Sequence, residues 1–178
     1  MIDIKDDLLK NRTTCIVFPL KDYPVMVNDL VKILAENYSK ILYVSLNRLY
    51  SPLKRKMQQD KIDTSRFLFV DCVTKTAVAQ PEEHEDCIYV SAPNALTEIS
   101  IAITKTVQTH YPDIIVFDSL STLLIYESQM SSSQFVHSIT NKMTAFGVNA
   151  CFTILNGEKE QQLIKDMNML LDKVIILS

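Results

Sequence analysis

The sequence predicts an α/β fold, a three-layer arrangement in which a mostly parallel sheet carries helices on both faces. Short β-branched and apolar runs alternate along the chain with longer segments whose apolar residues recur at helical spacing. The strand runs are apolar almost throughout, as expected for strands that are buried on both faces. The chain has 178 residues, is 47% hydrophobic and contains no repeat or linker, so we expect a single domain over residues 1–178.

The expected elements follow from these runs in chain order. Strands are expected at Thr13–Phe18, Lys40–Ser45, Phe67–Asp71, Ile88–Val90, Ile114–Asp118, Asn149–Leu155 and Lys173–Leu177. Helical stripes cover Met26–Leu34, Leu96–Val107, Phe135–Phe146 and Leu163–Leu171, and a short basic helix is expected at Pro52–Asp60. Gly147 is expected to cap the third stripe, and Thr74–Asp86 is expected to be a polar loop. We interpret the stripes as core packing.

Composition excludes several classes of protein. The net charge of -3 and the pI of about 5.6 argue against a chain whose main task is to grip nucleic acid. No apolar stretch approaches the roughly 20 residues that span a bilayer, and the N-terminus is acidic rather than signal-like, so a cytoplasmic location is expected. The four cysteines are expected to be buried and reduced, with zinc or a Cys72–Cys87 disulfide as alternatives.

The connection after the first strand has the length of a phosphate-binding loop but not its residues. A P-loop uses glycines to crowd backbone N–H groups around phosphate, a lysine to meet the phosphates and a hydroxyl to bind Mg²⁺. Aligned from the strand end, Pro19 and Pro24 replace the glycines, Val25 replaces the lysine and Met26 replaces the hydroxyl residue. Proline also lacks an N–H donor. We therefore expect that this loop does not cradle a triphosphate.

The strand 114–118 ends in an aspartate, which is the pattern of a carboxylate that holds Mg²⁺ in ATPases. Many strands end in an aspartate that only caps the following turn or helix. With the partner lysine and hydroxyl missing, a structural role is the favoured interpretation of Asp118.

Several segments together carry a resemblance to a known family. They are ILYVSLNRLYSPL (41–53), FLFVDC (67–72), NALTEIS (94–100) and FDSLSTLL (117–124). Their order and spacing, over roughly residues 12–178, resemble archaeal members of the RecA superfamily related to the clock protein KaiC. In that family a carboxylate pair commonly follows the second strand and polarises the attacking water. Here those positions are Asn47 and Arg48.

The resemblance implies a RecA-like fold without working ATP chemistry. We expect an inactive domain that binds proteins, either an active homologue or itself, with no catalytic residue, no metal and no cofactor. The former nucleotide site would be marked by Pro19, Lys21, Pro24, Val25, Met26, Asn47, Arg48 and Asp118. The apolar segment Leu123, Leu124, Ile125 and Tyr126 continues the strand end at Asp118 and is interpreted first as core. In the resembling ATPases subunits meet near the nucleotide sites, so a contact surface that includes Leu123, Leu124 and Tyr126 is the alternative.

Three alternative functions remain open at this point. An ATP- and Mg²⁺-binding protein could use an unusual loop with Lys21, Asp118 and either Asn47 or Asn156. A phospho-acceptor domain could use Asp71 as the acceptor and Lys159 as its companion lysine. Such a domain needs an acidic pair after the first strand to hold Mg²⁺, and this chain has Phe18 and Pro19 there. An accessory role in nucleic-acid transactions is disfavoured by the acidic balance.

The remaining polar clusters are interpreted as solvated surface. These are the basic residues 54–56, the acidic residues 82–86 with His84, and the serines that lack a nucleophile-elbow context.

Overall fold

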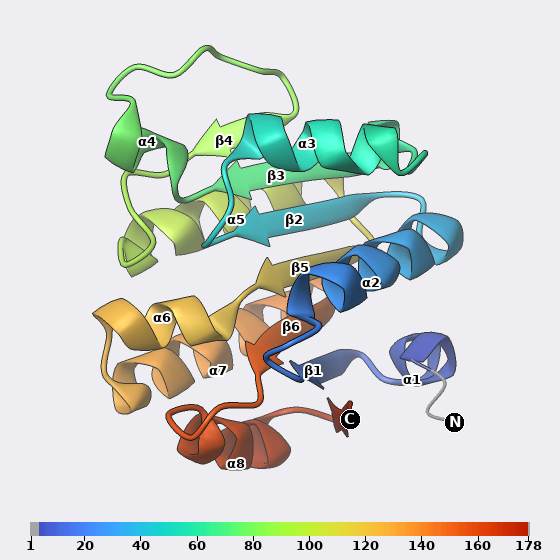
Figure 1. Cartoon of the computed structure of the whole chain (residues 1–178), viewed down its shortest axis with the longest axis vertical. Helices are drawn as coiled ribbons and strands as arrows, with labels where there is room; N and C mark the ends of the chain where they lie inside the picture. Colours follow the sequence, from blue (N-terminus) through green and yellow to red (C-terminus); the bar gives the residue numbers. More distant parts are fainter. Residues whose placement is uncertain (1–3, 178) are drawn as a thin grey trace.

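The computed structural model describes residues 4–177, which form one seven-stranded, all-parallel sheet (Figure 1). The strand order is β4-β3-β2-β5-β6-β1-β7. The strands are β1 (Thr13–Phe18), β2 (Ile41–Ser45), β3 (Phe67–Asp71), β4 (Cys87–Tyr89), β5 (Ile114–Asp118), β6 (Asn149–Leu155) and β7 (Lys173–Ile176). Because every pairing is parallel, all carboxyl ends of the strands lie along one edge of the sheet.

Helices cover both faces of this sheet, which confirms the expected three-layer α/β architecture (Figure 1). One face carries α1 (Ile4–Lys10), α2 (Tyr23–Asn37) and α3 (Tyr50–Gln59). The other carries α5 (Leu96–His110), α6 (Leu120–Tyr126), α7 (Gln129–Phe146) and α8 (Gln161–Leu170). The short α4 (Thr74–Ala77) and a 3₁₀ turn, Thr64–Arg66, complete the helices of the described residues.

The alternation of side chains in each strand builds two separate cores. In β1, Cys15 and Val17 join the core under α5 to α8, whereas Ile16 and Phe18 join the core under α1 to α3. All six residues of β1 are buried, as expected for a strand covered on both faces. Burial on both sides explains why the strand runs lack a polar face in the sequence.

The expected strands are confirmed, with ends that move by one residue at β2, β4 and β7. Gly147 caps α7 in the left-handed conformation, as expected. Three helices were not expected: the short α1 and α4, and α6, whose apolar segment follows the strand end at Asp118. Their seven, four and seven residues are too short to display a helical period.

All four cysteines are free and buried, in agreement with the expectation of buried thiols. Burial raises the pKa of Cys151 to about 12 and the pKa of Cys15 still further, so these thiols are protonated at neutral pH. Within residues 4–177 no group of three or more metal-ligating side chains could hold a metal ion. In the same range no helix has the length and apolarity to cross a bilayer.

Candidate functional site

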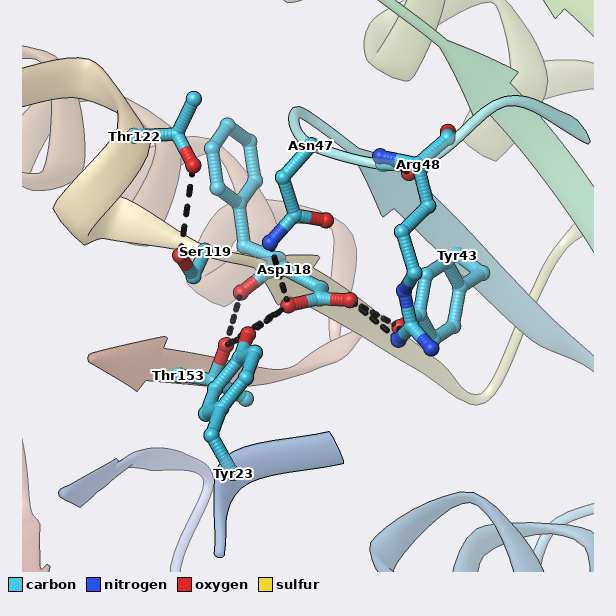
Figure 2. Close-up of polar contacts among 10 residues, drawn as sticks. Tyr23, Tyr43, Asn47, Arg48, Asp118, Ser119, Thr122 and Thr153 are labelled. Carbon is cyan, nitrogen blue, oxygen red and sulfur yellow. Dashed lines mark hydrogen bonds and ion pairs between the residues drawn. The ribbon is translucent and has the colours of Figure 1, made fainter. Parts of the chain in front are cut away.

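The carboxyl edge of the sheet brings together side chains from β2, the turn after it, β6 and α2 around Asp118, the last residue of β5. Ser45 at the end of β2 lies directly opposite Asp118 in the strand register, so the residues that follow β2 reach the same place. On the other side of β5, β6 contributes Thr153, and the first turn of α2 contributes Tyr23. Figure 2 shows these side chains converging on the carboxylate.

Asp118 is fully buried, and its carboxylate is enclosed by the protein's own donors. The Tyr23 hydroxyl donates to Oδ1, and the Tyr43 hydroxyl donates to Oδ2 (Figure 2). Arg48 Nη2 forms an ion pair with Oδ2 at 2.5 Å and also donates to the Tyr43 hydroxyl at 2.6 Å. The carboxylate is therefore satisfied by two hydroxyls and a guanidinium before any ligand is considered.

Two weaker contacts complete the surroundings of Oδ1. The side-chain amide of Asn47 and the hydroxyl of Thr153 each lie 3.4 Å from this oxygen. Thr153 also donates to the Phe117 carbonyl at 3.2 Å, which ties β6 to β5 at this point. The peptide bond between Asp118 and Ser119 is cis.

Arg48 is held in place by the turn that follows β2. The Ser45 hydroxyl donates to the Arg48 carbonyl at 2.6 Å and accepts from the Arg48 N–H at 3.1 Å. The guanidinium carbon lies 6.0 Å from the centre of the Tyr43 ring, within cation–π range. Arg48 Nε is buried without a hydrogen-bond partner among the described residues, so the guanidinium is fixed mainly through Nη2.

The pKa shifts of Tyr23, Tyr43 and Arg48 keep these three side chains protonated at neutral pH. Burial, followed by the neighbouring Asp118 carboxylate, raises the pKa of both Tyr23 and Tyr43 well above the usual tyrosine value. Burial acts against the charge of Arg48, but Tyr43 and Asp118 outweigh it and hold the pKa of Arg48 above its usual value. At neutral pH both tyrosines are therefore hydrogen-bond donors and Arg48 is a cation.

The connection between β1 and α2 is only four residues long, from Pro19 to Asp22. Of the expected loop residues, Pro24, Val25 and Met26 already belong to α2. Pro24 has no N–H, and the N–H groups of Val25 and Met26 both donate to the Asp22 carbonyl, at 3.1 and 3.0 Å. The first turn of α2 therefore presents few free amides, which are what an anion needs at a helix N-terminus.

The eight residues assigned to the former nucleotide site are thus only partly brought together. Asn47, Arg48 and Asp118 form one cluster. Lys21 is exposed and makes no ion pair within residues 4–177, and Val25 is 66% exposed. The connection that carries Lys21 supplies Tyr23 instead, from the first turn of the helix.

A hollow of about 550 Å³ lies beside this cluster, at the carboxyl edge. Hydroxyl and amide side chains line part of it, and half-buried or exposed apolar side chains line another part. Its lining residues are Tyr23, Asn47, Ser119, Ser121, Thr122, Leu124, Ile125, Leu155, Lys159 and Glu160. Asp118 itself does not line the hollow, whereas Tyr23 and Asn47 line it and also contact the carboxylate.

The suggested contact surface needs one correction. Leu123 is fully buried in the core under α6, so it cannot meet a partner, because α6 turns this side chain inward. Leu124 is half-buried, whereas Ile125 and Tyr126 are 74% and 54% exposed. The core interpretation is therefore confirmed for Leu123, and a contact surface at this segment is wrong for Leu123 and is left to the exposed Ile125 and Tyr126.

Asp71 does not fit the phospho-acceptor alternative. It is fully buried, and its carboxylate accepts from the N–H groups of Tyr50, Val73 and Thr74 and from the Thr74 hydroxyl, at 2.5 to 2.8 Å. It thus caps the starts of α3 and α4. Lys159 lines the hollow described above and makes no contact with Asp71 in the described residues.

The basic and acidic segments found in the sequence pair with each other. Lys54 forms an ion pair with Asp86 at 2.6 Å, and the Tyr50 hydroxyl donates to the same carboxylate at 2.6 Å. Lys56 pairs with Asp60. These contacts support the interpretation of both segments as structural surface.

Sequence reasoning missed Tyr23, Tyr43 and Thr153. Tyr43 lies inside an apolar strand run, where an aromatic residue is predicted to be part of the core. Thr153 lies inside the apolar run of β6 and is predicted to be core for the same reason. One signal was available: side chains two residues before the end of a strand share a face with its last residue, so Tyr43 and Ser45 lie on one side of β2. Tyr23 gives no such signal.

The seven-stranded parallel sheet with helices on both faces is a RecA-like α/β fold, and Asp118 ends its central strand β5. A KaiC-like protein from the hyperthermophilic archaeon Pyrococcus horikoshii OT3 is similar in structure, with a TM-score of 0.64 and 13% sequence identity. The match covers 93% of this chain and 70% of that one. Such a likeness concerns the fold alone.

The chain belongs to a family of unknown function (DUF7504), whose model matches residues 34–177. Comparison with curated proteins gives no match.

Proposed function

We propose that this chain is a RecA-like domain that does not hydrolyse ATP and that works by binding another protein. The observation that carries the proposal is the enclosure of the Asp118 carboxylate by Tyr23, Tyr43 and Arg48. In P-loop ATPases the carboxylate at this strand end helps to hold Mg²⁺. Here a guanidinium supplies the positive charge, so a metal ion would have to displace a buried ion pair.

The loop geometry supports the same conclusion. The phosphates of ATP are bound by free backbone amides and by a lysine in a glycine-rich loop. The four-residue connection after β1 contains no glycine, and Lys21 is exposed and makes no contact with Asp118 among the described residues. Asn47 and Arg48 replace the carboxylate pair that would polarise water in the resembling ATPases. A degenerate phosphate loop is the explanation that fits these residues.

Protein binding is proposed because large apolar side chains remain exposed around this edge. Leu20 and Val25 border the start of α2, Ile125 and Tyr126 end α6, and Met130 lies in the first turn of α7. Their exposed fractions range from 54% to 74%. Apolar groups that gather near one edge favour an interface, and the partner we propose is either a second copy of this chain or a homologue with an intact nucleotide site.

The hollow next to Tyr23 favours one alternative, the binding of a small ligand without catalysis. Asn47, Ser119, Thr122 and Lys159 offer hydrogen-bond donors there. An ATP-binding protein with an unusual loop would use the same space, and it would need Mg²⁺ to reach Asp118.

Calorimetric titration of the purified protein with ATP and ADP, with and without Mg²⁺, tests the absence of ATP chemistry. We expect no binding heat and no change in melting temperature at millimolar nucleotide, because neither the amides nor the carboxylate are free. Asp118→Asn is the matched control, since it removes the charge and keeps the shape. Micromolar, Mg²⁺-dependent binding that is lost in Asp118→Asn would refute the proposal. Weak binding that is independent of Mg²⁺ and unchanged in this variant would assign the hollow to a non-catalytic ligand.

A further inference from the structure

A second hollow, of about 850 Å³, lies at the opposite, amino-terminal edge of the sheet. It is formed where α2, α5 and α7 end and where β2, β5 and β6 begin. Tyr38, Tyr111 and Phe146 bring three aromatic rings to it, and Asp113 brings a carboxylate. No lysine or arginine lines it. Aromatic faces and one carboxylate together make a surface that favours a cation.

Tyr111 is held in an unusual backbone conformation beside this hollow. It ends α5 in the left-handed region, with φ of 51° and ψ of 60°, where glycine is normally favoured. Gly147 performs the same task at the end of α7, beside the same hollow, with φ of 71°. At Tyr111 the chain carries a side chain that is 76% exposed and that the fold does not need for its core. Strained positions of this kind cluster at binding sites.

The carboxylate of Asp113 is positioned but not neutralised. Its Oδ2 accepts from the N–H groups of Ser39 and Lys40, at 2.8 and 2.9 Å, which fixes the side chain. Oδ1 accepts no hydrogen bond from residues 4–177. The Lys40 ammonium donates to the His110 carbonyl at 2.7 Å and makes no ion pair with Asp113. One carboxylate oxygen is thus free to accept from a cationic ligand.

Phe146 and Tyr38 complete the apolar part of the hollow. Phe146, the last residue of α7, is 43% exposed although it is a large apolar side chain. Tyr38 is nearly buried, and its hydroxyl is used by the Leu8 carbonyl, so it offers mainly its ring. A planar cation with several N–H donors matches this combination best, because it can stack on an aromatic face while it donates to a carboxylate.

We propose that the amino-edge hollow binds the guanidinium group of an arginine, stacked on Tyr111 and paired with Asp113. This site is separate from the Asp118 cluster and does not rest on the function proposed for that cluster. The site would select a ligand group that is both positively charged and planar. A lysine ammonium would bind more weakly, and a neutral group of the same shape would not bind.

The test is a ¹H–¹⁵N NMR titration of the whole chain with Nα-acetyl-arginine methylamide. Two analogues serve as ligand controls. The citrulline analogue is planar but uncharged, and the lysine analogue is charged but not planar. We expect saturable shifts of amides around Tyr111, Asp113 and Phe146, in the order arginine, lysine, citrulline. A short Gly/Ser peptide with a single arginine distinguishes a site for an arginine of another protein from a site for a small free compound. Only a site for a protein's arginine would bind the peptide more tightly than the free derivative.

Two variants test the proposed contacts. Tyr111→Gly suits the left-handed backbone, so this variant is expected to fold with an unchanged or higher melting temperature and to bind about five-fold more weakly or worse. Asp113→Asn keeps an oxygen for the Ser39 and Lys40 amides and is expected to lose binding to a similar extent. Equal affinity for citrulline and arginine would overturn the proposal, as would unchanged affinity in both variants or the absence of saturation with both the free compound and the peptide.

Discussion

Replacing Arg48 with methionine is expected to lower the free energy of unfolding by about 3 kcal/mol, because it leaves the Asp118 carboxylate buried without its cation. Methionine keeps much of the length and apolar bulk of the arginine side chain, so the effect reports the lost charge rather than a cavity. Asp118 has no exposed surface, whereas the Arg48 side chain is 32% exposed. The cost should therefore be larger for the stranded carboxylate than for the stranded guanidinium.

A double-mutant cycle separates the ion pair from its surroundings. Asp118→Asn alone should cost about 1 to 2 kcal/mol, since Arg48 can turn toward solvent and the amide oxygen can still accept from one tyrosine. The double variant, with both changes, should be more stable than Arg48→Met alone. Urea denaturation of the four proteins measures this. If the two costs simply add, the residues are not coupled and the closed cluster described here is wrong.

Asp71 should be the second position with a large effect. Replacing it with alanine leaves the N–H groups of Tyr50, Val73 and Thr74 without their acceptor, at the starts of two helices. We expect a loss of about 3 kcal/mol in the free energy of unfolding, also measured in urea.

Two matched variants make that prediction specific. Thr74→Val removes only one of the four hydrogen bonds to Asp71 and should cost about 1 kcal/mol or less. Asp71→Asn keeps one acceptor oxygen and should fall in between. A loss below about 1 kcal/mol in Asp71→Ala would mean that water replaces the carboxylate, and the capping role would be refuted.

The fold could be predicted from the sequence because strands that are buried on both faces appear as continuous apolar runs. Runs such as Thr13–Phe18 and Ile114–Asp118 are apolar throughout, and long helices between them show a clear period. The short helix α6 could not be predicted in this way, because its seven residues are almost all apolar and display no polar face. Without this helix the sequence left Leu123 between core and a contact surface, and the structure buries it in the core.

The candidate site was predictable only in part, for a different physical reason. Asp118, Asn47 and Arg48 were found because they follow strand ends, and parallel strands end at one edge. Their direct contact was not foreseen, since it depends on the turn that Ser45 fixes. Tyr23 carries no local signal, and the signal for Tyr43 is only that it shares a face of β2 with Ser45. From sequence alone a tyrosine in an apolar segment is predicted to be a core residue, and only the structure shows its hydroxyl bonded to a buried carboxylate.

The resemblance to RecA-like ATPases and the structure agree about the scaffold and leave its use to experiment. The residues that shape the sheet are those that carry the resemblance, whereas the strand ends carry different chemistry. Tyr23, from the start of α2, takes up the space beside Asp118. The central claim is therefore that the protein closes this site with its own side chains.

Paramagnetic broadening by Mn²⁺ tests that claim most directly. In ¹H–¹⁵N spectra of the whole chain with Mn²⁺, alone and with ATP, the amide signals of Ser45, Asp118 and Ser119 are predicted to keep their intensity relative to other buried amides. Asp118→Asn is the control, because it removes the only buried carboxylate in the cluster. Selective loss of these three signals in the unmodified protein, with recovery in Asp118→Asn, would show that a divalent cation reaches the carboxylate and would contradict the closed site.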